Sequence, residues 1–216
     1  MTERIKTVAR QHLASDGSDL SLRAVARELG VVSSAVYRYF ASRDDLLTAL
    51  IIDGYDSMGV AVERAESVVA RRDLVGRWMA IGRAVREWSR ARPAEYALLY
   101  GTPIPGYAAP MDTVESAQRV LLVAVAVVRD GWDKGVVAAP SDRLPKAVRA
   151  DFERLTEYPG TEGVPLTLVG RLLTAWAQLF GTLSFELFGR YQNAIVDLDA
   201  YFDHELRGMA RHIGLA

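Results

Sequence analysis

The sequence predicts an all-α protein with a three-helix amino-terminal domain and a larger helical domain, together about nine or ten helices. Apolar residues recur at helical spacing along most of the 216 residues, and no segment shows the strict alternation of a half-buried strand. The single β-branched run, at residues 120–128, has helical flanks and is apolar on all sides, so we expect a central helix there. No proline precedes Pro93 to interrupt a helix.

The first helix is expected over residues 3–14. Thr2 with Glu3 is a plausible start, and Gly17 with its polar neighbours provides an end. Residues at i, i+3, i+4, i+7 and i+8 form one apolar face of a 3.6-residue period; they are Ile5, Val8, Ala9, His12 and Leu13.

Two short helices joined by a turn at Gly30 follow, and this arrangement predicts a helix-turn-helix. Ser21 is a suitable N-cap for the first helix, and Gly30 tolerates the left-handed conformation that ends it. The second helix is expected from Val32 or Ser33 to Tyr39. Its outward amino-terminal positions are small and polar, as required of a helix that enters a DNA major groove about 12 Å wide.

The next helix is expected to begin at Ser42, which with Asp45 resembles a capping box. It could extend to about residue 70, with Gly54 and Gly59 as weak points. We place the domain boundary inside this helix, so that residues 1–50 form one domain and residues 51–216 the other. Further helices are expected over residues 74–91, 93–100, 112–134, 141–157, 165–189 and 198–212, with a loop at 101–110.

Composition and motif content exclude several classes of protein. The net charge is −1 and cysteine is absent, so neither global basicity nor disulfide or thiol chemistry is indicated. The three histidines lack metal-ligand spacing, and no phosphate-binding glycine loop or paired catalytic carboxylates are present. We therefore expect no enzyme, no cofactor and no metal, in a cytoplasmic protein without a secretory signal. The uncharged stretch at residues 172–185 is too short to span a membrane.

The helix-turn-helix resembles that of the TetR family of bacterial transcriptional regulators. Residues 30–40 read Gly-Val-Val-Ser-Ser-Ala-Val-Tyr-Arg-Tyr-Phe, and residues 41–47 read Ala-Ser-Arg-Asp-Asp-Leu-Leu. The family pattern there is roughly G-V-S-x-G-T-L-Y-x-H-F-x-S-K-E-x-L-L. The resemblance implies base or near-base contacts from Arg23, Ser33, Ser34 and Ala35, and phosphate contacts from Ser21, Tyr37, Tyr39 and Arg43; Arg38 is a further candidate for contact with DNA.

This sequence departs from the family pattern beside the turn that reads bases. Val32 replaces a serine, Ser34 and Ala35 replace glycine and threonine, and Tyr39 stands where histidine is common. The operator sequence therefore cannot be carried over from relatives.

The second domain resembles a carboxy-terminal domain type known for a Trp-His-Gly signature. Residues 94–107 and the run Trp-Ala-Gln-Leu-Phe-Gly at residues 176–181 carry the resemblance, with Phe180 in place of the histidine. It implies a ligand pocket between helices, with aromatic and other large apolar walls, although such residues more often form core. The candidates are Trp78, Trp88, Tyr96, Tyr100, Met111, Phe152, Trp176 and Phe180, with Arg83, Glu87, Gln118 and Arg171 as possible polar anchors.

The same resemblance implies a homodimer through the helices at about residues 165–189 and 198–212, which would form a four-helix bundle across a two-fold axis. The alternative is that both helices belong to the core of one monomer. The function implied is a repressor of a double-stranded DNA operator, released by a small apolar or amphipathic effector that moves the helix beginning at Ser42. A constitutive DNA-binding protein without a ligand is the alternative.

Overall fold

The structure, a computed structural model, describes residues 1–16, 20–141, 143–156 and 160–216. All regular elements within these residues are helices and no strand is present, which confirms the predicted fold class. The helices are α1 (Thr2–Asp16), α2 (Leu22–Glu28), α3 (Ser33–Tyr37), α4 (Arg43–Ser67), α5 (Leu74–Ala91), α6 (Pro93–Tyr100), the 3₁₀ turn η1 (Met111–Thr113), α7 (Val114–Asp133), α8 (Lys146–Leu155), α9 (Leu166–Leu187) and α10 (Leu198–Ile213).

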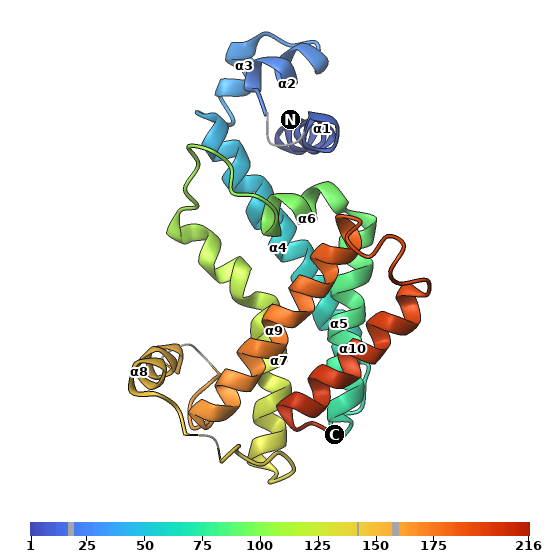
Figure 1. Cartoon of the computed structure of the whole chain (residues 1–216). Helices are drawn as coiled ribbons and strands as arrows, with labels where there is room; N and C mark the ends of the chain where they lie inside the picture. The colour runs from blue at the N-terminus through green and yellow to red at the C-terminus, as the bar shows by residue number, and fades with distance from the viewer. Residues whose placement is uncertain (17–19, 142, 157–159) are drawn as a thin grey trace.

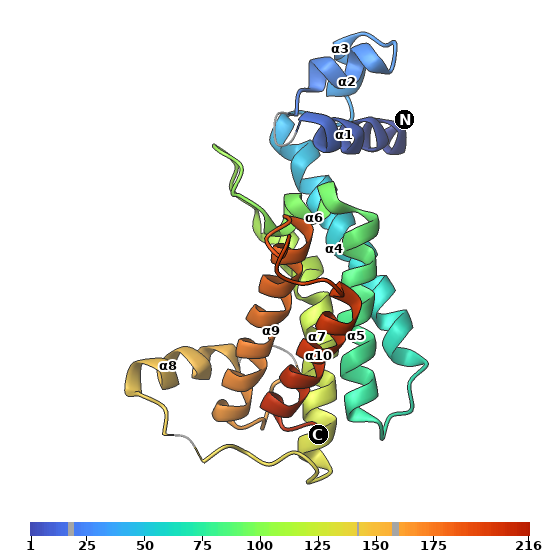
Figure 2. The same ribbon diagram turned by 45° about the vertical axis from the view of Figure 1, so that its right-hand side comes forward.

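The molecule is elongated, with α1, α2 and α3 gathered at one end (Figure 1). Helix α4 leaves this end and runs into a bundle that contains α5, α7, α9 and α10 (Figures 1 and 2). Helix α6 lies across the junction, where it packs against both α1 and α4. The long helix α4 is therefore the covalent connection between the two ends, while α6 provides a second contact between them.

Two apolar cores occupy the two ends of the molecule, and α4 contributes to both. Leu46, Leu47 and Leu50 belong to the amino-terminal core, which α1, α2 and α3 complete. Further along the same helix, Met58 and Val62 enter the core of the large bundle. A displacement of α4 along or about its axis must therefore disturb the packing of both cores, because close-packed interiors tolerate little change in shape.

Helix α4 runs without interruption through Gly54 and Gly59, which the sequence suggested as weak points. Both glycines allow close packing on this helix. A Cβ atom at Gly54 would lie 3.3 Å from a methyl carbon of Leu99 in α6, and one at Gly59 would overlap the side chain of Arg119 in α7. The cost in helix propensity is therefore offset by the close approach of α6 and α7.

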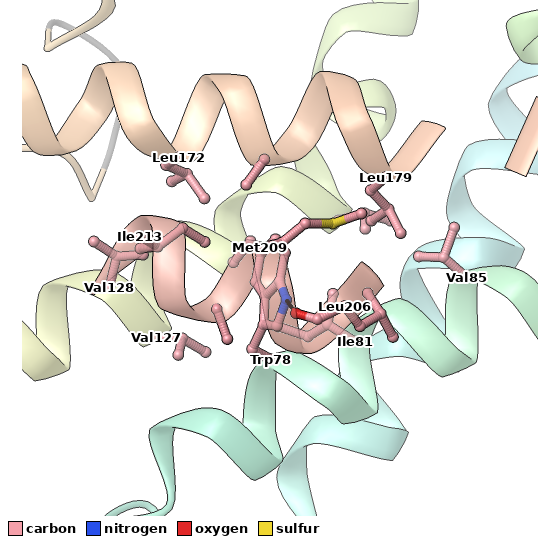
Figure 3. Packing of buried hydrophobic residues seen from close by; sticks show 14 of the residues in the cluster. Trp78, Ile81, Val85, Val127, Val128, Leu172, Leu179, Leu206, Met209 and Ile213 are labelled. Atoms are coloured by element: carbon pink, nitrogen blue, oxygen red, sulfur yellow. Dashed lines mark hydrogen bonds between the residues drawn. The ribbon is translucent and has the colours of Figure 1, made fainter. Parts of the chain in front are cut away.

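The core of the bundle is built around Trp78 of α5. Its indole Nε1 donates a hydrogen bond to the main-chain oxygen of Leu206 in α10, at 3.1 Å. Figure 3 shows the ring packed among residues of α5, α7, α9 and α10, including Val127 and Met209. Because a buried indole N–H needs a partner, this hydrogen bond fixes α10 against α5 at one point along both helices.

Ion pairs from two largely buried arginines of α5 connect this helix to α4, α7 and α9. Arg77 of α5 is fully buried; its Nε lies 2.5 Å from Glu66 of α4 and its Nη1 lies 2.6 Å from Asp130 of α7. Arg86 of α5 pairs with Glu186 of α9 at 2.8 Å. Charges removed from water require such partners, so these pairs restrict how the helices can be arranged.

Several helices begin or end one to three residues from their predicted bounds, and one begins five residues late. The helix expected over residues 141–157 begins at Lys146, because the extended conformation of Pro145 precludes an earlier start. The helix expected to reach Tyr39 ends at Tyr37, where Arg38 and Tyr39 form a turn. Two predicted helix termini, one at Gly17 and one at residue 157, lie outside the described residues.

Helix α9 is long and apolar enough to cross a membrane by length and composition alone. Its Leu168, Leu172, Leu179 and Leu183 side chains are buried in the bundle core, and the helix packs against α5, α7, α8 and α10. These contacts are those of a core helix in a helical bundle.

Candidate DNA-binding surface and adjoining cavity

The helix-turn-helix is built from local sequence signals. The Ser21 hydroxyl accepts the main-chain N–H of Ala24 at the start of α2. At the other end Gly30 has a φ of +67°; its N–H binds the oxygen of Arg27 and the N–H of Val31 binds that of Ala26. This pair of bonds is a Schellman motif, which satisfies the last carbonyls of α2 and turns the chain into α3.

Most of the side chains predicted to touch DNA, which belong to α2, α3 and the residues next to them, are accessible to solvent. Ser21, Arg23, Ser34, Tyr37, Arg38 and Tyr39 are exposed, whereas Ser33 and Ala35 are half-buried. The apolar Val36 and Phe40 point inward and hold α3 against the amino-terminal core. Among the described residues, Arg23 and Arg38 have no hydrogen-bond or ion-pair partner, so their guanidinium groups are available to phosphates.

Arg43 differs from the other two arginines because it also has a structural contact. Its Nε donates to the main-chain oxygen of Leu20 at 3.1 Å, and its Nη1 lies 3.7 Å from Asp44. The side chain thus links the start of α4 to the segment before α2. Ser42 caps α4, since its hydroxyl accepts the N–H of Asp45 at 3.0 Å.

Charged side chains attach α1 to the junction between the two ends, a feature that the sequence did not predict. Lys6 and Arg10 both contact Asp53 of α4, at 2.7 and 2.6 Å, and Arg10 also lies 3.7 Å from Glu95 of α6. Burial works to lower the pKa of Lys6, but its bonds to Asp53 and Glu3 raise that pKa above its usual value. No local motif signals these pairs, since their members are more than forty residues apart in the chain.

The loop of residues 101–110, which connects α6 to η1, also reaches the amino-terminal core. Ile104 and Tyr107 pack against that core together with Leu98 of α6. The Tyr107 hydroxyl lies 2.9 Å from the Thr48 hydroxyl of α4, within hydrogen-bond distance. Figures 1 and 2 show this loop, in green, rising from the bundle beside the first turns of α4.

A cavity of about 490 Å³ adjoins this contact, with Tyr107 in its wall, and lies between α4, α6, the 101–110 loop, α7 and α9. We call it the junction cavity. Ile51 and Tyr55 of α4 form one side and Gln118 of α7 another. Its volume falls within the range of small-molecule sites, and its lining is mainly apolar with a few polar groups, as such sites usually are. The remaining principal walls come from Leu99, Tyr100, Ile104, Tyr107, Leu121 and Trp176.

A second, smaller cavity of about 270 Å³ lies between α7, α8 and α9. Its described lining is almost wholly aliphatic, with Val125, Leu172 and Leu173 among its walls. Gln118 and Leu121 of α7 line both cavities, so the two lie side by side along that helix. We call it the aliphatic cavity.

Only two of the predicted pocket aromatics line the junction cavity, namely Tyr100 and Trp176. Phe180 lies behind them, with its ring stacked on Tyr100 at 4.2 Å and tilted against Trp176 at 4.8 Å between centroids. Tyr96 is fully buried; its hydroxyl donates to the main-chain oxygen of Phe180 at 3.1 Å. These four rings form one aromatic group, with Tyr100 and Trp176 at its cavity side.

The remaining predicted pocket residues lie elsewhere. Trp78 belongs to the bundle core, and Trp88 is buried with its Nε1 donating to the Ser57 hydroxyl at 2.9 Å. Met111 is 80% exposed on η1, and Phe152 of α8 approaches Gly170 of α9. Helical spacing does not distinguish Trp78 and Trp88 from Tyr100 and Trp176, because core and cavity walls lie on the same inward faces of the helices.

Of the four predicted polar anchors, Gln118 lines the cavities, whereas two of the others serve structural contacts. Arg83 pairs with Asp203 of α10, and Arg171 donates to the main-chain oxygen of His212 at 3.2 Å. Glu87 is exposed on α5. In the described part of the chain, no group of three His, Asp or Glu side chains is placed to hold a metal ion.

Among the described residues, the phenol hydroxyls of Tyr55 and Tyr100 in the junction cavity have no hydrogen-bond partner. Burial raises the pKa of both phenols, and for Tyr100 the nearby Tyr55 and Tyr96 raise it further. Both groups therefore remain protonated at neutral pH and present O–H donors. The two rings meet edge to face, with 6.0 Å between their centroids.

Sequence comparisons agree with this arrangement. A model described as "Bacterial regulatory proteins, tetR family" matches residues 5–50, and one described as "Tetracyclin repressor-like, C-terminal domain" matches residues 78–209. The HTH-type transcriptional regulator Rv1816 of Mycobacterium tuberculosis (strain ATCC 25618 / H37Rv) is 39% identical over 203 residues, which cover 92% of this chain and 85% of the relative.

Solved structures show the same architecture. The candidate regulatory protein SCO4313 superposes with a TM-score of 0.75 at 33% identity, covering 96% of this chain and 94% of the other. A protein of unknown function from Rhodococcus sp. RHA1 gives a TM-score of 0.69 at 26% identity, with the same coverage. The matched families and the named relative are regulators rather than enzymes. The chain therefore belongs to the TetR family of bacterial regulatory proteins, and it is a DNA-binding transcriptional regulator with an amino-terminal helix-turn-helix.

Proposed function

We propose that this protein is a homodimeric repressor that leaves its operator when a small, largely apolar effector occupies the junction cavity. The observation that carries the proposal is the position of that cavity: its walls include α4 and the 101–110 loop, and both elements also pack into the amino-terminal core. A molecule in the cavity thus contacts two of the elements that connect the bundle to the DNA-binding domain. Because this protein would act on bacterial DNA, the proposal also places it in the cytoplasm.

The DNA-binding part of the proposal assigns base contacts to the first turn of α3 and phosphate contacts to the groups around it. Ser33, Ser34 and Ala35 are small enough for α3 to enter the major groove. The proposed phosphate contacts come from Arg23, Arg38, Tyr37 and Tyr39, which are accessible donors. A two-fold dimer would place the two α3 helices about 34–36 Å apart, or a multiple of that distance, to read equivalent half-sites.

The proposed dimer interface uses the outward face of α9 and the adjoining face of α10. Leu173, Ala177, Gly181 and Phe185 recur every fourth residue on α9 and are all exposed in the monomer. Leu173 and Phe185 expose 42% and 53% of their surface, which is high for apolar side chains on one helix face. Burial of this stripe against the same stripe of a second chain would satisfy the requirement of a two-fold interface for self-complementary surfaces.

Effector and operator would be linked through two conformations of the dimer. The operator favours the conformation whose α3 helices match the half-site spacing, and the effector must favour another conformation to displace it. A ligand with equal affinity for both would release nothing. Coupling in binding is reciprocal, so operator DNA should weaken effector binding by the same factor by which the effector weakens operator binding.

The test begins with genome-wide selection of binding sites by the purified protein, which identifies the operator and its neighbouring genes. Fluorescence anisotropy with that operator then measures release on adding cell extract, fractionated extract or a library of apolar compounds. Release by one fraction or compound, without loss of the dimer, supports the proposal. Operator binding that no extract or compound reverses would instead support the alternative of a constitutive DNA-binding protein.

A further inference from the structure

We infer that the effector is an uncharged, largely apolar molecule that carries a hydrogen-bond acceptor, bound in the junction cavity with the acceptor directed at Tyr55, Tyr100 and Gln118. This inference rests on the proposed role of the cavity as the effector site and goes beyond it by naming the chemical class of the ligand.

The first reason is the absence of charge on the cavity wall. None of the described residues that line the junction cavity is Asp, Glu, Lys, Arg or His. The nearest arginine in sequence to Gln118, Arg119, is paired with Glu63 at 2.6 Å. An ionised ligand would have to leave water and enter the cavity without a counter-ion. Its desolvation free energy would be far more unfavourable than that of an uncharged ligand of the same shape.

The second reason is the set of polar groups that the wall does contain. Tyr55, Tyr100 and Gln118 come from three different helices and converge on one cavity. Among the described residues, none of the three side chains has a hydrogen-bond partner, although all are partly buried. The polar atoms of these three side chains are open to the cavity rather than sealed inside the protein, so a suitable ligand can bind them directly in place of water.

The third reason concerns the direction of these hydrogen bonds. Phenols have a pKa near 10 and are protonated at neutral pH, so in the absence of an acceptor from the protein each O–H is free to donate to a ligand. A carbonyl, ether or hydroxyl oxygen on the ligand would accept from them. The aromatic side chains Tyr55, Tyr100 and Trp176 would cover the apolar part of the same molecule.

The inference is tested by isothermal titration of the full-length protein, without DNA, with matched probes at pH 7.4. The probes are 2-acetylnaphthalene (uncharged acceptor), 2-naphthoate (anion), 2-(aminomethyl)naphthalene (cation) and 2-ethylnaphthalene (uncharged, no acceptor), together with the smaller pair acetophenone and benzoate. We expect a ketone to bind tightest, with its matching carboxylate weaker by about tenfold or more, which corresponds to about 1.4 kcal/mol. The ethyl compound should be weaker by roughly three- to tenfold, the range expected from one hydrogen bond.

Two variants assign the effect to this cavity. Tyr100→Phe should weaken the ketone about three- to tenfold while leaving 2-ethylnaphthalene unchanged, because it removes one O–H and keeps the ring. Tyr191→Phe, a matched hydroxyl deletion outside the cavity, should change neither. Gln118→Glu should raise the affinity for the cationic probe relative to the ketone; circular dichroism and thermal unfolding verify that the variant remains folded.

Carboxylate affinity equal to or above that of the ketone would overturn the inference, and so would failure of both ketones to bind. An unchanged ketone affinity in both Tyr100→Phe and Gln118→Glu would overturn the site. Operator anisotropy separates this result from that of the proposed function. A ketone that binds as expected without releasing the operator would refute the repressor mechanism alone, whereas release caused only by charged compounds would refute the inference alone.

Discussion

The hydroxyl groups of Thr48 and Tyr107 lie 2.9 Å apart and join the second turn of α4 to the 101–110 loop. Tyr107 also lines the junction cavity, and its ring packs against the amino-terminal core. One side chain thus contacts the cavity, the loop and the domain that carries α3. The contact links the 101–110 loop to the first part of α4, in addition to the covalent connection that α4 itself provides.

This hydrogen bond should be measurable by a double-mutant cycle. Thr48→Val and Tyr107→Phe each remove one hydroxyl while keeping the packed volume, and each should lower the free energy of unfolding by about 0.5–1.5 kcal/mol. Because both variants break the same bond, the double variant should cost less than the sum of the two. Urea unfolding at one fixed protein concentration measures the cycle; additive losses would show that the hydroxyls do not interact in solution.

Phosphate binding by Arg38 and Arg23 should appear in the salt dependence of operator binding. Arg38→Ala removes a guanidinium that has no partner among the described residues, so its effect on folding should be small. Operator affinity should fall, and the slope of log K against log salt should decrease in magnitude by about 0.9 for each phosphate that the variant no longer neutralises. Arg149→Ala on the exposed face of α8 is the matched control. An unchanged slope in both Arg23→Ala and Arg38→Ala would remove these residues from the interface.

The proposed dimer face can be disrupted without touching the monomer core. Ala177 is exposed on α9 within the apolar stripe, so Ala177→Arg should fold normally yet introduce a charge into a desolvated interface. Sedimentation velocity should show a shift toward monomer at micromolar concentration, with weaker operator binding as a consequence. Ala150→Arg, an identical change on exposed α8, should leave the sedimentation coefficient unchanged. A stable dimer in the Ala177→Arg variant would place the interface elsewhere.

The ion cluster at Asp130 offers a comparison between a buried and an exposed arginine that bind the same carboxylate. Arg77 is fully buried and contacts Asp130 and Glu66, while the side chain of Arg71 is 65% exposed and contacts Asp130 at 2.5 Å. Arg77→Met should cost about 3–5 kcal/mol, because it leaves two carboxylates without their buried partner. Arg71→Met should cost at most about 1 kcal/mol. Denaturant unfolding measures both, and equal losses would contradict the role of burial.

Acid should weaken the contact between α4 and α7. The hydrogen bond from Arg119 lowers the pKa of Glu63 below its usual value. A carboxyl whose pKa is lower in the folded state stabilises the fold above its unfolded pKa and loses that effect as the pH falls through the folded value. The stability difference between wild type and Glu63→Gln should therefore be present at pH 7 and decrease below about pH 4.5.

Urea unfolding between pH 7 and pH 3 follows this difference. An Arg119→Met background supplies the control, because without the guanidinium Glu63 has no reason to titrate at a lower pH in the folded protein than in the unfolded chain. A pH-independent difference in the wild-type background would contradict the pairing of Glu63 with Arg119.

The sequence by itself determined the helical fold and the local construction of the helix-turn-helix. The helices at residues 74–91 and 93–100 coincide with their predicted bounds. The signals that predict these bounds, Pro93 and the spacing of apolar residues, involve positions that are close together in the chain. Ser21, Gly30 and Ser42 perform the capping roles expected of them for the same reason. Such signals are local, since a cap or a turn contacts main-chain groups only two to five residues away.

Only the tertiary structure decided which inward-facing residues form core and which border a cavity. Trp78 and Trp176 both lie on apolar faces of long helices, yet one bonds to Leu206 in the core and the other lines the junction cavity. Likewise, nothing near Lys6 indicates Asp53, and nothing near Thr48 indicates Tyr107. Helical periodicity specifies the direction in which a side chain points, but its neighbour belongs to a distant segment, whose position depends on the packing of the whole bundle.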